Sequence, residues 1–221
     1  HSYAQLIVSF FLDSTKWNRY THRELGVIGE TLDIPNILII GENSQAGTYI
    51  LRIRLKESIK LKFGGFKKGK LIPLPAGDYT YVGSALSEKG STSLARRLVR
   101  HTTRTGNKPP HTIRDDMIKE FNKSQLGPPN PLPISGKNLF WNIDYFLNLE
   151  VAEIINVIAI RSSERLENTI SEFLESNPDT HIIEKSLGAN DSPQHTHILS
   201  VNDDDNWWNS IADCLQRTYT P

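Results

Sequence analysis

Hydrophobic and polar residues alternate along three stretches in the first half of the chain. Residues 48–55 (TYILRIRL) place two arginines opposite a row of apolar side chains, residues 59–63 (IKLKF) repeat this pattern with lysines, and residues 78–83 (DYTYVG) alternate aromatic with small residues. A period of two is typical of a strand with one buried and one exposed face. The pattern therefore predicts three such strands.

Helical spacing and unbroken apolar runs predict further elements downstream. Residues 91–102 (STSLARRLVRHT) begin with serines that can cap a helix, and residues 162–176 show a second helical pattern that ends before an Asn-Pro pair. Residues 151–160 (VAEIINVIAI) are typical of a buried strand, residues 196–201 of a shorter one, and the C-terminal end of an amphipathic helix. Because strands and helices alternate irregularly, we expect an α+β fold with a small, mostly antiparallel sheet flanked by helices.

Composition divides the chain into segments. Residues 1–45 are interpreted as an N-terminal extension, residues 46–202 carry the regular elements, and residues 203–221 form a C-terminal tail. Within the central domain, residues 105–137 contain six prolines around one polar helical piece. Loops of this length are typically functional or disordered, so we expect a long surface insertion here.

The composition indicates a soluble globular protein. The 221 residues include 38% apolar and 23% charged residues, and no stretch offers the roughly 18 consecutive apolar residues of a membrane helix. The longest apolar run, LIVSFFL at residues 6–12, lacks the basic start and the cleavage site of a signal peptide. The single cysteine, Cys214, excludes a disulfide within this chain and a thiolate metal site. We therefore expect a cytoplasmic protein that does not associate with membranes.

Charge is unevenly distributed, although the net charge of the chain is zero. Residues 47–110 contain 14 Lys and Arg against 3 Asp and Glu, a net charge of +11, whereas residues 139–221 contain 4 against 14, a net charge of −10. Such a split indicates either that the basic half meets a polyanion or that the two halves neutralise each other in the fold. Charge alone does not decide between these interpretations.

Six sequence blocks follow one another in a distinctive order. They are GTYIL at 47–51, GDYTYVGSA at 77–85, LARRLVRH at 94–101, WNIDYFL at 141–147, a helix led by Glu167, and GAND at 188–191 with THI at 196–198. Together they resemble the GIY-YIG nuclease superfamily, and within it a small branch known mainly as a domain of unknown function. The resemblance covers residues 47–201.

The resemblance implies a three-stranded central sheet and an endonuclease that hydrolyses phosphodiester bonds of DNA with Mg²⁺ or Mn²⁺. Tyr49 would activate or position the attacking water, Tyr81 would orient groups in the site, and Arg97 would clamp the phosphate with Arg100 or His101 assisting. Glu167 would hold the divalent ion, because a hard oxygen ligand suits Mg²⁺. The residues expected to contact the substrate are Gly83, Ser84, Arg96, Arg100, Asn142 and His197.

Two chemical conditions follow for these roles. Free tyrosine has a pKa of about 10, so Tyr49 needs a nearby cation in order to act as a base near neutral pH. Asn142 stands where the branch has a histidine, so activity would be weakened or lost if that histidine relays protons. Glu164 lies one helical turn from Glu167 and is an alternative metal ligand.

Two other functions stay open on the sequence alone. A catalytically weak nucleic-acid-binding module would fit Asn142 and the basic region, and it would bind in a salt-sensitive way without cleaving. A protein-interaction domain would use Trp207, Trp208 and the acidic tail as its contact surface, since aromatic residues are enriched at interfaces.

Overall fold

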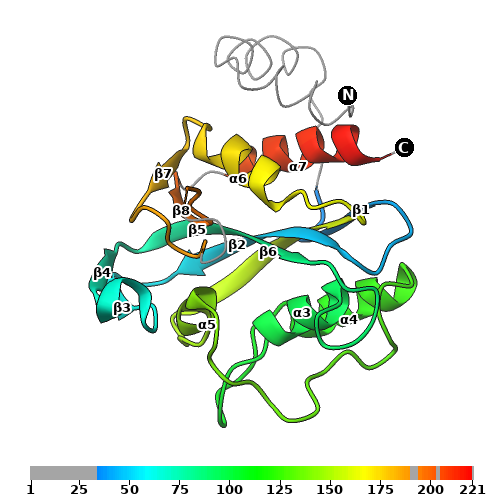
Figure 1. The fold of residues 1–221 in the computed structure, drawn as a ribbon, viewed down its shortest axis with the longest axis horizontal. Helices are drawn as coiled ribbons and strands as arrows, with labels where there is room; N and C mark the ends of the chain where they lie inside the picture. Colours follow the sequence, from blue (N-terminus) through cyan, green and yellow to red (C-terminus); the bar gives the residue numbers. More distant parts are fainter. Residues whose placement is uncertain (1–33, 190–193, 203–204, 221) are drawn as a thin grey trace.

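The structure is a computed structural model that describes residues 34–189, 194–202 and 205–220. The apolar run at 6–12, most of the expected N-terminal extension and the Asn190–Asp191 pair lie outside these residues. Within them, six strands form one mixed sheet in the order β1-β6-β2-β5-β8-β7 (Figure 1). The strands are β1 (Ile37–Gly41), β2 (Gly47–Leu55), β5 (Gly77–Ala85), β6 (Ala152–Arg161), β7 (Thr180–Ile182) and β8 (Ile198–Val201).

The central sheet is larger than the three strands expected. β2 lies between β5 and β6 and pairs antiparallel with both over its whole length. β1 adds a parallel strand on the other side of β6, although its residues fall within the segment interpreted as an extension. The pattern along one strand cannot show how many distant segments will pair beside it, which is why the expected sheet was too small.

The strand expected at residues 59–63 lies outside this sheet. It forms β3 (Ile59–Lys62), which pairs with β4 (Leu71–Leu74) in a separate two-stranded ribbon, with the short 3-10 turn η1 (Phe66–Gly69) between them. The lysines of β3 are exposed and alternate with half-buried apolar residues. This ribbon therefore keeps one face in water, whereas the central sheet is covered on both faces.

Helices cover the two faces of the sheet, with α3, α4 and α5 on one side and α6 and α7 on the other (Figure 1). Their bounds are α3 (Leu94–His101), α4 (Arg114–Lys123), α5 (Asn142–Leu147), α6 (Glu167–Glu175) and α7 (Asp205–Tyr219). None of the helices in the described part of the chain is long and apolar enough to cross a bilayer.

Two hydrophobic clusters result, because successive residues of a strand point to opposite sides of the sheet. On β2, Tyr49 joins the cluster beneath α3, α4 and α5, whereas its neighbour Ile50 joins the cluster beneath α6 and α7. Met117 of α4 is fully buried in the first cluster, so the proline-rich segment 105–137 contributes to the core. Trp208 of α7 is 2% exposed and belongs to the second cluster.

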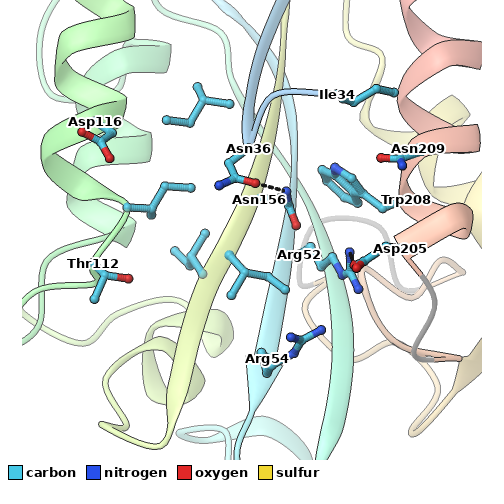
Figure 2. A pocket seen from close by; sticks show the side chains of 14 residues that line it. Ile34, Asn36, Arg52, Arg54, Thr112, Asp116, Asn156, Asp205, Trp208 and Asn209 are labelled. Carbon is cyan, nitrogen blue, oxygen red and sulfur yellow. Dashed lines mark hydrogen bonds and ion pairs between the residues drawn. The ribbon is translucent and has the colours of Figure 1, made fainter. Parts of the chain in front are cut away.

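The arginine face of β2 is covered at Arg52 but exposed at Arg54. Arg52 is 2% exposed, and its guanidinium binds Asp78 of β5 at 2.6 Å and Asp205 of α7 at 2.7 Å. Figure 2 shows Arg52 beside Asp205. Arg54 binds the same Asp78 carboxylate. Burial by itself raises the pKa of Asp78, but hydrogen bonds and charges from both arginines bring this pKa below its ordinary value of 3.8. The alternating pattern predicted a polar face exposed along its length because it cannot show that a distant helix covers Arg52.

Candidate functional site

Six of the residues predicted for the site converge on one pocket, where β2 begins and β5 ends. The pocket has a volume of about 220 Å³. The six are Tyr49, Tyr81, Ser84, Arg97, Glu167 and His197, and the pocket is also lined by Trp141 and Arg165. They come from β2, β5, α3, α6 and the segment before β8, so only the assembled sheet brings them together.

Tyr49 owes its position to the glycine opposite it. Tyr49 on β2 is paired with Gly83 on β5, and a Cβ atom at position 83 would lie 2.5 Å from the Tyr49 hydroxyl oxygen. Any side chain there would displace the tyrosine ring from its buried position. Gly83 was expected to contact the substrate; in the structure, the space that a side chain at this position would need is filled by the Tyr49 ring.

The Tyr49 hydroxyl is held by His101 of α3. Its oxygen lies 2.7 Å from His101 Nε2, and both side chains are buried. Burial raises the pKa of Tyr49, and Arg97 only partly offsets this. Burial also lowers the pKa of His101 well below 6.5, and the charge of Lys137 adds to that shift. Near pH 7 the pair is therefore a neutral phenol against a neutral imidazole. The expected cation is present, but desolvation outweighs its effect on Tyr49.

Glu167 is the ionised carboxylate of the pocket. It is the first residue of α6, where a negative charge is favoured by the helix dipole. It accepts a hydrogen bond from the Ser84 hydroxyl, and His197 Nδ1 lies 3.1 Å from its Oε1. Burial by itself raises the pKa of Glu167, but the neighbouring His197 and the hydrogen bond from Ser84 bring it below its ordinary value. The alternative ligand Glu164 is exposed and does not line the pocket.

A divalent ion in this pocket would have to be held mainly by water and substrate. Among the described residues, no group of three or more His, Cys, Asp or Glu side chains could enclose a metal ion. Mg²⁺ is commonly bound through one or two carboxylates together with waters and substrate phosphates. Glu167, ionised and facing the pocket, could supply that single carboxylate.

Arg97 is held against the pocket by an aromatic ring. Its guanidinium carbon lies 5.4 Å from the centre of the Trp141 ring, a cation–π contact that limits where the guanidinium can point. Because Trp141 and Arg97 both line the pocket, the cation faces the space where a substrate would sit.

Arg100 has a structural partner instead. Its two terminal nitrogens each donate to the Asp144 carboxylate at 2.9 Å, and one also donates to the Asn138 carbonyl. The buried Asn142 and the half-buried Arg96 do not line the pocket either. The structure therefore brings neither these three residues nor Gly83 into direct contact with the pocket.

Sequence reasoning assigned no role to three residues that shape this site. Trp141 and Asp144 belong to the block WNIDYFL at 141–147, so the resemblance offered a signal for both residues. Lys137 stood in the proline-rich segment with no signal at all, yet its Nζ is buried 3.4 Å from Asp144 Oδ1. Burial lowers the pKa of Lys137 to about 8, although Asp144 acts in the opposite direction.

A larger cavity of about 540 Å³ shares no lining residue with this pocket. Figure 2 shows it between α4 and α7, where Asn36 and Asn156 are joined by a hydrogen bond. The charges of its two arginines are engaged by Asp78 and Asp205. We place the candidate site in the smaller pocket, because that is where cations, phenols and a carboxylate face one space.

Comparison with known proteins identifies the family of the chain. No curated protein and no solved structure matches it. A sequence model of the family described as domain of unknown function DUF123 matches residues 48–220, which span every strand of the sheet except β1 and all five helices of the described part. The chain therefore belongs to this family, domain of unknown function DUF123.

Proposed function

We propose that the protein is a metal-dependent endonuclease of GIY-YIG type that hydrolyses phosphodiester bonds of DNA. The observation that supports this most is the convergence of Tyr49, Tyr81, Arg97 and Glu167 on one pocket from four separate elements. Phosphodiester hydrolysis needs an activated water, a cation against the phosphate and a metal ion, and these side chains can supply or hold each of them.

In this proposal the base is the Tyr49–His101 pair rather than a tyrosinate. As the attacking water approaches, the Tyr49 oxygen accepts its proton while the Tyr49 hydroxyl passes its own proton to His101 Nε2, 2.7 Å away. The imidazole is unprotonated near neutral pH because burial keeps its pKa low, so its Nε2 has a lone pair that can take this proton. His101 Nδ1 lies 3.9 Å from Asp144 Oδ1, so a carboxylate is near the imidazolium that forms. Asn142 takes no part in this relay.

Arg97 and the metal ion would share the negative charge of the phosphate. Arginine presents a planar fork of donors that matches phosphate oxygens, and Trp141 keeps that fork beside the pocket. A divalent ion bound to Glu167 would act as a Lewis acid on the phosphate oxygens. His197 lines the pocket and its Nε2 is buried with no hydrogen-bond partner among the described residues, so this nitrogen can hydrogen-bond a water or a hydroxyl group there.

The protein-interaction alternative loses its main support. Trp207 and Trp208 lie on α7, are 3% and 2% exposed, and pack into the second hydrophobic cluster. They therefore offer no surface to a partner. The nucleic-acid-binding alternative differs from our proposal only in lacking chemistry, and the cleavage experiment separates the two.

The test is cleavage of labelled DNA by purified protein with Mg²⁺ or Mn²⁺. Removing the proton relay with Tyr49→Phe should lower the rate about 10²- to 10⁴-fold, the usual contribution of general base catalysis. Glu167→Gln should cause a comparable loss by weakening metal binding. Cleavage products are separated on a denaturing gel over a time course.

Matched controls are available in the same elements. Tyr79→Phe alters a tyrosine of β5 whose hydroxyl binds the Pro75 carbonyl, and Glu164→Gln alters an exposed glutamate before α6; both should retain the full rate. Equal cleavage by all four variants would place the chemistry elsewhere. Salt-sensitive DNA binding without cleavage under either metal would support the binding module instead.

A further inference from the structure

An exposed aromatic ring stands beside the candidate site, at the entrance to α5. Phe140 is 73% exposed, and its neighbour Trp141 lines the pocket. The two rings meet edge to face, with centroids 4.9 Å apart and an interplanar angle of 85°. We call these two residues the aromatic step. A single exposed phenylalanine is common on a protein surface. What distinguishes Phe140 is its position beside the pocket.

The aromatic step is fixed in place by a buried carboxylate. Asp144 Oδ2 accepts hydrogen bonds from the backbone nitrogens of Phe140 at 3.0 Å and Trp141 at 2.9 Å. The same carboxylate binds Arg100 of α3. Burial by itself raises the pKa of Asp144, but the hydrogen bond from Arg100 and the charge of Lys137 bring it to about 2, so the anchor stays ionised at neutral pH. The step is therefore tied to the helix that carries Arg97.

The aromatic step and the cation of the pocket form one unit. The Arg97 guanidinium lies over the Trp141 ring, and Phe140 extends this surface outward into solvent. In a nucleotide, one sugar joins the base to the phosphate, so a phosphate held at Arg97 has its base within reach of the step. Proteins that bind single strands combine a cation for the backbone with an aromatic ring on which a base stacks.

We propose that the aromatic step stacks an unpaired nucleobase next to the scissile phosphate. This rests on the proposed function and specifies its substrate class: single-stranded or locally unpaired DNA is preferred over intact duplex. Within a duplex the faces of each base are already covered by its neighbours, so a protruding ring gains a stacking partner only where a base is unpaired.

The test measures binding, without divalent metal, by fluorescence anisotropy of a labelled single strand, a blunt duplex, and a duplex with one unpaired base. Phe140→Ala should weaken binding of the single strand and of the unpaired base roughly 5- to 150-fold, and binding of the blunt duplex less than about twofold. Phe140→Tyr keeps a ring and should restore the preference. Leu71→Ala, which removes a 51% exposed apolar side chain from β4, is the control for general loss of apolar surface.

An oligonucleotide series with one abasic position, moved along the strand, gives a second measurement. At one position the loss of the base and Phe140→Ala should cost less together than the sum of their separate effects, because they remove the same contact. Additive losses at every position, or equal losses on duplex and single strand, overturn the inference. If the wild type cleaves DNA while Phe140→Ala leaves both preferences unchanged, the inference fails and the proposed function stands. If the protein neither binds nor cleaves any DNA, both fail.

Discussion

At the scale of residues, the site is governed by what burial does to charge. Tyr49 and His101 both stay neutral because they lie out of water, so the mechanism we propose uses a proton relay in place of the tyrosinate that a nearby cation was expected to produce. Behind them, Lys137 Nζ and His101 Nδ1 are buried, have no hydrogen-bond partner among the described residues, and lie near the same Asp144 oxygen. A buried ammonium with one carboxylate partner loses its proton more easily than one in water.

Because of Lys137, the free energy of unfolding should depend on pH in the alkaline range. Its pKa is lowered to about 8 in the folded protein from an ordinary 10.5. Between these values the unfolded chain holds a proton that the folded protein has released, so the free energy of unfolding rises with pH, by at most about 1.4 kcal/mol per pH unit. In the Lys137→Met variant, the free energy of unfolding should not show this rise between pH 8 and pH 10.5. Urea unfolding of both proteins at pH 7.5 and 9.5 measures the difference, with Lys56→Met as an exposed control. A constant difference between wild type and Lys137→Met at both pH values would contradict the assignment.

At the scale of elements, β2 organises the molecule because both of its faces are used. One face presents Tyr49 to the pocket, and the other holds Arg52 against β5 and α7. A buried charge is tolerated only with partners, and Asp78 supplies carboxylate oxygens to both arginines of β2. This ion pair ties together the two strands whose ends form the site.

Asp78→Asn should destabilise the protein strongly. It leaves the buried guanidinium of Arg52 with a weaker partner, which typically costs about 3 kcal/mol or more. The pKa of Asp78 is lowered on folding, so its contribution is complete above the unfolded value of 3.8 and is lost as pH falls below it. The difference in stability between wild type and Asp78→Asn should therefore be smaller at pH 3 than at pH 7. Thermal unfolding of both proteins at these two pH values measures it. Asp116→Asn, at an exposed surface pair, is the control; a gap independent of pH would mean that the charge of Asp78 does not matter.

At the scale of the whole molecule, distant halves of the chain neutralise each other. Ion pairs join the basic and acidic regions at Arg52 with Asp205, Arg100 with Asp144, Arg104 with Glu153, and Lys67 and Lys70 with Glu184. Part of the charge split seen in the sequence is therefore neutralised within the fold. Arg97 and Arg165 are the cations that line the pocket.

Because the sheet has a hydrophobic cluster on each face, we expect that a substitution in one cluster can lower stability without lowering activity. Trp208→Ala empties part of the cluster beneath α7 and should reduce the free energy of unfolding by about 3–5 kcal/mol. The pocket draws its phenols from β2 and β5 and Arg97 from α3, whereas Glu167 comes from α6, which packs on the same cluster as Trp208. DNA cleavage at a temperature where the variant is folded should match the wild type as long as α6 keeps its position without the Trp208 ring. Gln216→Ala, exposed on the same helix, is the control. A loss of cleavage in a folded Trp208→Ala protein would show that the two faces are coupled.

Local patterns were sufficient for some elements and not for others. The expected strand at 151–160 and helix at 91–102 correspond to β6 and α3, because an apolar run and a helical stripe are local signals. The sequence resemblance also picked out Tyr49, Arg97 and Glu167, which the fold brings together. The ribbon of β3 and β4, the parallel strand β1 and the buried Arg52 were not foreseen, since each depends on which distant segment lies alongside.

What the sequence by itself determined was several of the strands and helices and the side chains that can do chemistry, because periodicity and residue type act over a few positions. Only the tertiary structure decided their environment: that both faces of β2 are covered, which arginine faces the pocket and which is engaged by Asp144, and that Tyr49 and His101 are both uncharged. The physical reason is that desolvation and ion pairing depend on every neighbour in space, and those neighbours come from distant parts of the chain.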